Sequence, residues 1–326
     1  MEAPVVLIIF NRPDTTQKVF DQIAKVRPNK LFIIAEGPRD NHPEDVVRCA
    51  TARAVAESVN WDCEVFKNYA DTDLSAGVRI STGLNWVFEQ VDRAIILEDD
   101  CVPQLGFFRF CDELLERYKN DARIMHISGS NFQLGVRRTK FSYFFSHHNI
   151  CWGWATWRRA WRHFDIEVKA WPLLRESSWL LNIVGDRRAA DLWRDCFDNS
   201  NMRRGEIHWD YPWTFACWLR DGLSILPQTN LITNIGFGPD STHFKTGNSP
   251  VAFLPSEDVA FPLRHPPRVV RNVRADRAII NRVVLPKLGP RPSLMRRVLS
   301  RLFGIVPDPM RRRLALFRDL VRSYNL

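Results

Sequence analysis

The segment from Ala94 to Pro103 most constrains the fold of this chain, because an apolar run passes directly into three consecutive acids. Four apolar residues are followed without a break by Glu98, Asp99 and Asp100. A continuous apolar run is typical of an interior strand of a parallel sheet, and such sheets bind ligands at the carboxyl ends of their strands. Three adjacent carboxylates repel one another, and a hard divalent cation that carries substrate phosphates is the usual compensation for such a charge.

A second interpretation of the three acids is structural. They can form a solvated acidic turn, or they can cap the helix expected at Phe107–Lys119, because carboxylates stabilise the N-terminus of a helix. A short acidic cluster does not by itself separate these interpretations. The surrounding chain has to decide between them.

The first hundred residues alternate strands with helices. The expected strands are Val5–Phe10, Leu31–Ala35, Cys63–Phe66 and the run before the acids, with helices at 15–26, 46–59 and 80–90 between them. This alternation predicts a parallel sheet covered on both faces by right-handed crossovers.

Three of these four strands end in charged residues that are expected to face one crevice. They are Arg12, Glu36 together with Arg39, and the acid triplet. The chain contains neither a G-x-G-x-x-G motif nor a G-x-x-x-x-G-K-[ST] motif. A bound phosphate would therefore have to be met by arginine and metal rather than by a glycine-rich loop.

Beyond Arg123 the pattern changes to shorter strands and a segment rich in tryptophan. Strands are expected at 124–128, at the aromatic run 140–146, which should be antiparallel, and at 224–227 and 231–233. Residues 151–161 contain four tryptophans. Either Trp154, Trp157 and Trp161 form one face of a helix against the core, or the Trp-Gly-Trp segment approaches a ligand closely, since glycine permits such an approach.

Two further segments carry candidate chemistry. Asp210 lies near the start of a helix expected at 214–219, where its first interpretation is an N-cap. The following loop, 236–244, is punctuated by glycine and carries hydroxyl groups and a histidine, and we expect it to be mobile.

Composition indicates an ordinary globular protein. The 326 residues are 45% hydrophobic and 25% charged, which suits one large α/β domain or two smaller ones. The seven cysteines contain no C-x-x-C pair, so we expect free thiols in a reducing compartment. The run at Val5–Phe10 is too short for a secretion signal, and no apolar stretch reaches membrane-spanning length, so the expected location is the cytoplasm.

The positive charge is concentrated in the C-terminal tail. The formal net charge is +9, yet residues 261–326 alone contain 16 Lys and Arg against three Asp. Two amphipathic segments, Ser293–Phe303 and Met310–Tyr324, predict helices that either lie on an anionic membrane surface as a peripheral anchor or dock on the body of the protein. Nucleic acid is not expected as a partner, because these arginines are not interleaved with base-stacking aromatics.

Taken in order, the acid triplet, Trp152-Gly153-Trp154 and the Trp-Asp-Tyr-Pro-Trp segment resemble the GT-A superfamily of nucleotide-sugar glycosyltransferases. The resemblance is greatest to the inverting N-acetylglucosaminyltransferase I-like branch and related bacterial glycosyltransferases. It implies a GT-A-type, Rossmann-like α/β fold with a mostly parallel sheet, helices on both faces, a smaller antiparallel acceptor-side part and a basic helical tail. The implied divisions are a donor-binding half at 1–125, an acceptor and catalytic half at 126–255, and the tail at 256–326.

The resemblance assigns roles at the donor site. Asp100 corresponds to the ligand of Mn²⁺, or Mg²⁺, that bridges the donor's phosphates. Glu98 and Asp99 match the acids that hold ribose and sugar hydroxyls. Arg12 matches the arginine that meets the pyrophosphate. Glu36 stands in place of the more usual Asp that contacts the nucleobase.

Four more positions follow from the same resemblance. Arg79 corresponds to the basic residue that opens the helix before the triplet. Gly83 stands where that branch has a base-stacking His, so stacking must come from elsewhere. Thr242, or its neighbour Ser241, is expected to reach phosphate when the loop closes, with His243 adjacent. Trp154 is expected to shape the donor-sugar pocket.

These assignments predict an inverting glycosyltransferase. A sugar would move from a nucleotide diphosphate donor, expected to be a UDP-sugar, to a hydroxyl of a glycan or glycolipid-type acceptor, with Asp210 as general base. One rival is a catalytically silent carbohydrate-binding or scaffolding module on the same fold. Another is a nucleotidyltransferase, which would be expected to carry a glycine-rich signature where Asn11-Arg12-Pro13 stands.

Overall fold

The computed structural model describes residues 1–202, 208–237, 251–252 and 254–288. The chain divides into two compact units, Met1–Leu285 and Pro286–Leu326. Nearly all of the second unit, including both predicted tail helices, lies outside the described residues. Among the helices that are described, none is both long and apolar enough to cross a membrane.

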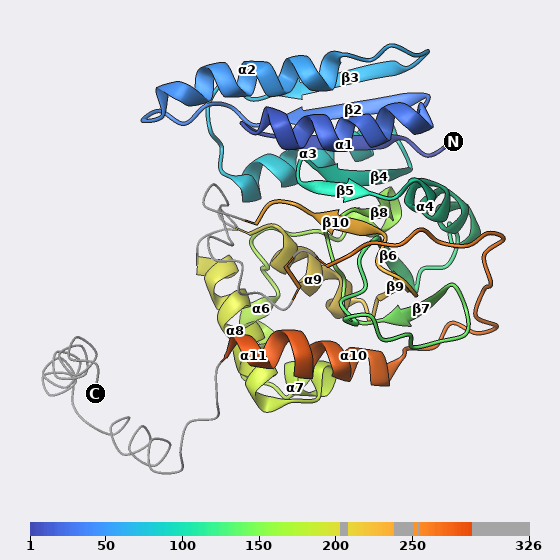
Figure 1. Ribbon diagram of the computed structural model, residues 1–326. Coiled ribbons are helices and arrows are strands. Elements are labelled where there is room, and N and C mark those ends of the chain that lie inside the picture. Colours follow the sequence, from blue (N-terminus) through green and yellow to red (C-terminus); the bar gives the residue numbers. More distant parts are fainter. Residues whose placement is uncertain (203–207, 238–250, 253, 289–326) are drawn as a thin grey trace, which may run out of the picture. The chain divides into compact units, whose positions relative to one another are not determined.

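The first unit is built on one eight-stranded sheet with the order β3-β2-β1-β4-β8-β6-β9-β7 (Figure 1). The first four strands in this order are parallel, and β8 runs antiparallel to both of its neighbours, β4 and β6. β9 is parallel to β6, and β7 closes the edge antiparallel to β9. The strand bounds are β1 Val5–Ile9, β2 Lys30–Ala35, β3 Glu64–Tyr69, β4 Arg93–Glu98, β6 Ile124–Ser128, β7 Tyr143–Ser146, β8 Trp154–Trp157 and β9 Leu223–Pro227.

Helices cover both faces of this sheet because its central strands are apolar on both sides. Val5, Leu7 and Ile9 of β1 belong to one buried cluster, and Val6 and Ile8 to another. The first cluster includes α1 Pro13–Val26, α2 Pro43–Glu57 and α4 Leu105–Arg117, and the second includes α3 Ala76–Gln90, α5 Arg158–Trp161 and α9 Asp210–Leu219. The predicted α/β fold, a mostly parallel sheet between two layers of helices, is confirmed.

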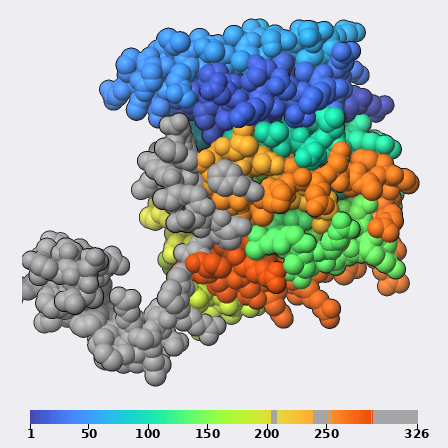
Figure 2. Space-filling model, viewed as in Figure 1, coloured from blue at the N-terminus to red at the C-terminus, as the bar shows by residue number. Residues whose placement is uncertain are grey.

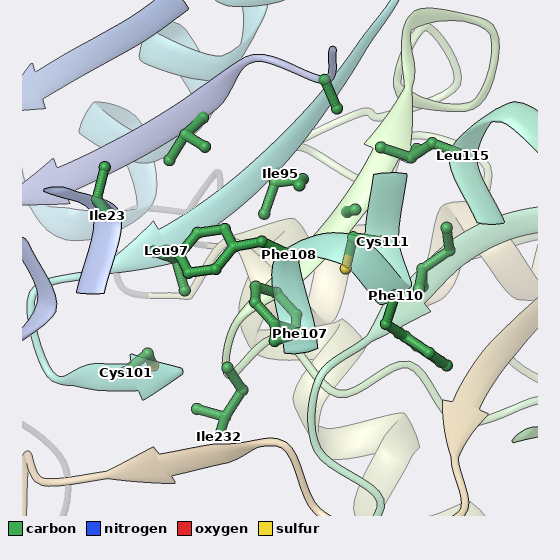
Figure 3. Packing of buried hydrophobic residues seen from close by; sticks show 14 of the residues in the cluster. Ile23, Ile95, Leu97, Cys101, Phe107, Phe108, Phe110, Cys111, Leu115 and Ile232 are labelled. Atoms are coloured by element: carbon green, nitrogen blue, oxygen red, sulfur yellow. The ribbon is translucent and has the colours of Figure 1, made fainter. Parts of the chain in front are cut away.

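Helix α4 shows how the acid segment is supported from one side. Phe107, Phe108 and Cys111 of α4 are fully or almost fully buried in the same cluster as Ile95 and Leu97 of β4 (Figure 3). The strand that leads to the acids is therefore held by close apolar packing, which fixes where the acids emerge.

The tryptophan-rich segment differs from the predicted single helix. Trp154 and Trp157 lie on strand β8, and only Trp161 lies on the short helix α5. Because side chains alternate across a strand, Trp154 joins the cluster on one face of the sheet and Trp157 the cluster on the other. The helical interpretation of these three residues is therefore wrong.

The remaining helices lie around α9 and beside β7. α6 Trp171–Leu174, α7 Trp179–Val184 and α8 Arg187–Met202 share a third buried cluster with residues of α9 and of the π-helix η1, Ile280–Val284. α10 Val273–Ile279 packs with η1 against β7 and β9 in a fourth cluster, and α11 spans Leu285–Lys287.

The tail begins later than the predicted boundary at 256. Gly106 donates its backbone N–H to Asp258 at 3.0 Å, Arg109 stacks over Phe261 at 4.0 Å, and Ser142 donates to the carbonyl of Arg264 at 2.8 Å. Figure 2 shows this orange part of the chain lying against the turquoise and green surfaces. These contacts make 256–285 part of the first unit.

A two-stranded antiparallel sheet lies next to the acids. It pairs β5, Cys101–Pro103, with β10, Ile232–Asn234. Ile235 donates its N–H to the carbonyl of Asp100 at 2.8 Å. The acid triplet is thus a tight connection between two strands of different sheets, so its backbone is fixed at both ends.

Candidate active site

The acids lie at the topological switch point of the sheet. The chain passes outward from β1 to β2 and β3 and then returns to the other side of β1 at β4. Ligands of open α/β sheets bind at such a point, outside the carboxyl ends of the strands. Arg12 follows the end of β1, Glu98 is the last residue of β4, and Asp99 and Asp100 come directly after it, so the sheet places them side by side.

Arg12 bridges two of the three acids. Its Nη2 donates to Asp99 and lies 3.0 Å from Oδ2 of Asp100. The other oxygen of Asp99 also accepts from the Phe10 N–H at 3.4 Å. Asp99 is only 2% exposed, whereas the side chain of Asp100 is 16% exposed. The oxygens of Asp99 therefore serve Arg12 and the backbone, and its predicted contact with donor hydroxyls stays a prediction.

The crevice has an excess of negative charge. Burial raises the pKa of Glu98 well above its usual range, and the charges of Asp100, Asp99 and Asp210 raise it further. Burial likewise raises the pKa of Asp99, with Arg12 opposing the shift. Burial lowers the pKa of Arg12, but Asp99 and Asp100 more than reverse this effect. One arginine thus faces a group of carboxylates, and an additional cation would be favoured there.

The fold brings Asp210 to this crevice from far along the chain. Burial chiefly raises the pKa of Glu98 and of Cys151, and the negative charge of Asp210 adds to both shifts, so Asp210 lies within electrostatic range of these two side chains. Asp210 is the first residue of α9, its side chain is 45% exposed, and Nδ1 of His208 lies 3.9 Å from its carboxylate. The positive end of the helix dipole stabilises the ionised form at this position.

Beneath Asp210 lies a layer of buried rings, which we call the aromatic layer: His126, Trp154, Trp161, Trp209 and Trp213. Trp154 stacks on Trp209 with ring centroids 5.3 Å apart and on His126 at 5.0 Å. Trp213 donates from Nε1 to Nδ1 of His126 at 3.2 Å. The aromatic layer therefore fixes the position of the start of α9.

Trp154 does not line an open pocket, contrary to the prediction. Its side chain is 0% exposed because the other rings of the aromatic layer enclose it. Its effect on the site is exerted through Trp209, the residue before Asp210. His126 was missed at the sequence level, since one histidine within an apolar strand carries no signal of its partners.

Glu36 lies at the end of β2 with one oxygen left open. Its Oε1 accepts from the N–H groups of Gly37 and Leu74, both at 3.0 Å. Its Oε2 is buried and makes no hydrogen bond within the described residues, although the residue is only 7% exposed. Burial also raises the pKa of this carboxyl. The open oxygen suits the predicted contact with a nucleobase, because buried polar atoms in folded proteins normally have partners.

Arg79 has a structural position. It is buried and donates from Nε to the carbonyl of Ala35 at 3.1 Å and from Nη2 to the side chain of Asn68 at 2.6 Å. It therefore ties the ends of β2 and β3 together, and its donor-binding role stays a prediction. At Gly83 a Cβ would lie 2.7 Å from Ile34, so α3 packs directly on β2 and leaves no space for a stacking side chain.

The metal-ligating side chains of the crevice suit a cation that is held largely by the phosphates of a substrate. Among the described residues, no three His, Cys, Asp or Glu side chains are gathered so that they could hold a metal ion. Mg²⁺-type sites that use one or two carboxylates together with substrate phosphates do not require three, so Asp100 as a single protein ligand fits this pattern. At Gly236 a Cβ would lie 2.0 Å from Oδ2 of Asp100, so only glycine fits beside that oxygen. Thr242, Ser241 and His243 lie outside the described residues.

Comparison with known proteins gives distant structural similarities only. No protein-family model and no curated protein matches the sequence. The apo form of mouse xyloside xylosyltransferase 1 aligns with a TM-score of 0.34 and 12% identity over 69% of this chain and 85% of that chain. The 4-diphosphocytidyl-2C-methyl-D-erythritol synthase from Anaerococcus prevotii aligns with a TM-score of 0.30 and 9% identity over 48% of this chain and 72% of that chain.

A third solved structure, UDP-glucose pyrophosphorylase complexed with UDP-glucose, gives a TM-score of 0.26 and 9% identity over 45% of this chain and 63% of that chain. Similarities this low carry no inference about the activity of this chain.

Proposed function

We propose that this protein is a nucleotide-sugar-dependent glycosyltransferase of the GT-A type, similar in its motifs to the inverting N-acetylglucosaminyltransferase I-like branch. The observation that carries the proposal is the meeting of three chain-distant groups at the switch point of the sheet. Arg12 touches Asp99 and Asp100, and Asp210 is close enough to shift the pKa of Glu98. This arrangement supports the proposal because it would bring diphosphate binding and base catalysis, the two sides of a transfer reaction, into one crevice.

The donor side uses Arg12, Asp100 and Glu36. A guanidinium is suited to a diphosphate because it donates several hydrogen bonds in a fixed planar geometry. Asp100 would hold Mn²⁺ or Mg²⁺, which when bound neutralises charge on the leaving diphosphate. The open Oε2 of Glu36 would accept a hydrogen bond from the nucleobase, as the N3–H of uracil offers. This favours a UDP-sugar.

The acceptor side uses Asp210. A sugar hydroxyl has a pKa far above 7, so its attack on the anomeric carbon requires a general base. An ionised carboxylate that is partly exposed and stabilised by a helix N-terminus can take that proton. Attack by the acceptor oxygen breaks the bond between the anomeric carbon and the phosphate oxygen in a single displacement, which inverts the configuration. The acceptor would be a hydroxyl of a glycan or glycolipid.

The test is a panel of nucleotide sugars incubated with the full chain and Mn²⁺, with products followed by ³¹P NMR. A glycosyltransferase releases a nucleoside diphosphate, and weak hydrolysis of one UDP-sugar without acceptor is the expected result. Release of pyrophosphate from a nucleoside triphosphate and a sugar phosphate would instead identify a nucleotidyltransferase. A protein whose melting temperature responds to no nucleotide would be the silent module.

A further inference from the structure

We propose that Arg12 is an internal counter-cation that competes with the divalent cation for Asp100, so that binding of the cation releases Arg12 to the donor phosphates. This inference rests on the proposed function, because it assumes that Asp100 is the metal ligand and that a diphosphate is bound. It adds a coupling between binding of the cation and binding of the donor, which the separate roles of Arg12 and Asp100 do not imply.

The carboxylate of Asp100 already has partners within the protein. Its Oδ2 lies 3.0 Å from Nη2 of Arg12 and is closed on another side by Gly236, while its Oδ1 accepts from Sγ of Cys101 at 3.4 Å. A divalent cation would coordinate the same carboxylate at about 2 Å. Two cations on one carboxylate repel each other strongly in a buried site. Arg12 and the metal are therefore competitors.

The backbone of Arg12 is held separately from its guanidinium. Its carbonyl is fixed as the N-cap of α1, where it accepts from the N–H of Thr16 at 3.0 Å and from the Thr16 hydroxyl at 2.8 Å. Its guanidinium, by contrast, makes hydrogen bonds and ion pairs only to Asp99 and Asp100 among the contacts described. The side chain is 24% exposed and can turn toward the crevice while the backbone stays in place.

The N-terminus of α1 offers a destination for the Arg12 guanidinium close by. The 14-residue helix α1 begins at Pro13, so its N-terminus opens at the same strand end as Arg12. Helix N-termini favour phosphate because their free N–H groups and dipole face the anion. A diphosphate held by the metal on Asp100 would bring its negative oxygens to this region, where a displaced Arg12 would find a new partner.

The consequence is positive coupling between cation and donor. A cation that displaces Arg12 makes the guanidinium available to phosphate, and a donor that captures Arg12 makes Asp100 available to the cation. Linkage requires both effects to have the same size. The alternative is that Arg12 remains with the carboxylates permanently and only supports the acid turn.

The decisive variant is Arg12→Gln, studied by calorimetric titration of the full chain with MnCl₂ alone and then with UDP in the presence of Mn²⁺. We expect Arg12→Gln to bind Mn²⁺ about 5-fold or more tightly than the wild type, within the usual range of coupling energies. Its affinity for UDP should fall at the same time. A permanent structural role predicts no such opposite change, because loss of the support would weaken both ligands.

The matched control is Arg48→Gln. Arg48 is exposed and donates from Nε to the carbonyl of Asn11 at 2.8 Å, so the variant removes a positive charge at the same strand end without touching the acids. At 0.15 M salt its affinity for Mn²⁺ should stay within about 2-fold of the wild type, because distant exposed charges are screened. Arg12→Lys should lie between the wild type and Arg12→Gln, and it decides the question if the glutamine variant fails to fold.

Two failures are distinguishable. If the wild type binds neither Mn²⁺ nor any nucleotide sugar, the proposed function is wrong. If the wild type binds both, and the folded Arg12 variants bind Mn²⁺ as weakly as the wild type or more weakly, then the competition is wrong while the proposed function stands.

Discussion

The charged crevice after β4 and the aromatic layer beneath α9 bury titratable side chains in opposite ways. In the crevice, several carboxylates share one arginine, and burial pushes the pKa values of Glu98 and Asp99 upward. In the aromatic layer, His126 is kept neutral by burial and its ring is hydrogen-bonded on both nitrogens. The crevice keeps unfavourable charge that a ligand could neutralise, whereas the aromatic layer has been made neutral and densely packed.

This difference separates the residues that we expect to serve ligand binding and catalysis from those that we expect to stabilise the fold. The carboxylate of Asp210 adds to the negative charge of the crevice. The helix on which it lies is supported by the aromatic layer, through Trp209 and Trp213. We therefore expect substitutions in the crevice to change ligand binding and turnover, and substitutions in the layer to change stability first.

The largest effect is expected for Asp210→Asn. Transfer should fall by about 10²–10⁴-fold, the usual contribution of a general base, while Mn²⁺-dependent UDP binding and the melting temperature stay near those of the wild type. Transfer is measured by product release and binding by calorimetry. Glu44→Gln, an exposed acid in the first turn of α2, is the matched control and should leave both unchanged. Transfer within about 10-fold of the wild type would show that Asp210 is not the base.

Trp154→Ala should have the largest effect on stability. Removing a fully buried Trp from the aromatic layer costs about 3–5 kcal/mol of unfolding free energy, through lost burial and the cavity left behind. Urea denaturation followed by circular dichroism measures it. Asp100→Ala is the contrasting variant from the crevice: it should change stability much less and abolish Mn²⁺-dependent donor binding. Equal destabilisation by the two variants would contradict the division between the regions.

Gly236→Ala tests how tightly the crevice is built. The added Cβ would lie 2.0 Å from Oδ2 of Asp100, so the carboxylate has to move, and overpacking of this kind costs about 1–3 kcal/mol. Affinity for Mn²⁺ and UDP should fall together in calorimetric titrations. Gly185→Ala is the control, because Gly185 has a positive φ but no neighbour within 4 Å of an added Cβ, so it should lower stability alone. Unchanged affinity for Mn²⁺ and UDP in Gly236→Ala would show that Asp100 is not a ligand of the metal.

A further effect concerns the pH dependence of stability. Burial lowers the pKa of His126 to about 3 from 6.5, so below pH 6.5 the unfolded chain binds a proton that the folded chain does not. His126 therefore stabilises the fold fully above pH 6.5, and this stability is lost as the pH falls toward 3, by up to about 1.4 kcal/mol per pH unit. His126→Gln should show a shallower loss of unfolding free energy between pH 6.5 and 4 than the wild type. Identical slopes would show that His126 is not held neutral.

Most of the sheet could be predicted from the sequence, because strand and helix patterns are local. The apolar runs that became β1, β2 and β4 and the helices that became α1, α3 and α4 appear within a few residues of their predicted ends. The tryptophan-rich segment was mispredicted because tryptophans spaced three or four apart suit a helical face, whereas pairing of β8 between β4 and β6 makes residues 154–157 a strand. The boundary of the tail was misplaced because its hydrogen bonds to α4 and β7 are with residues far away in sequence.

The sequence by itself determined the central strands, their order of appearance and the acids at the end of β4, since burial and backbone pairing leave a periodic pattern of apolar residues. Only the tertiary structure decided which groups meet: Arg12 on Asp99 and Asp100, Gly236 against Asp100, Asp210 within electrostatic range of Glu98, and His126 in hydrogen-bond contact with Trp213. These meetings depend on strand order and on helices packed across the sheet. Contacts between distant residues leave no period in the sequence, so a single chain cannot reveal them before it is folded.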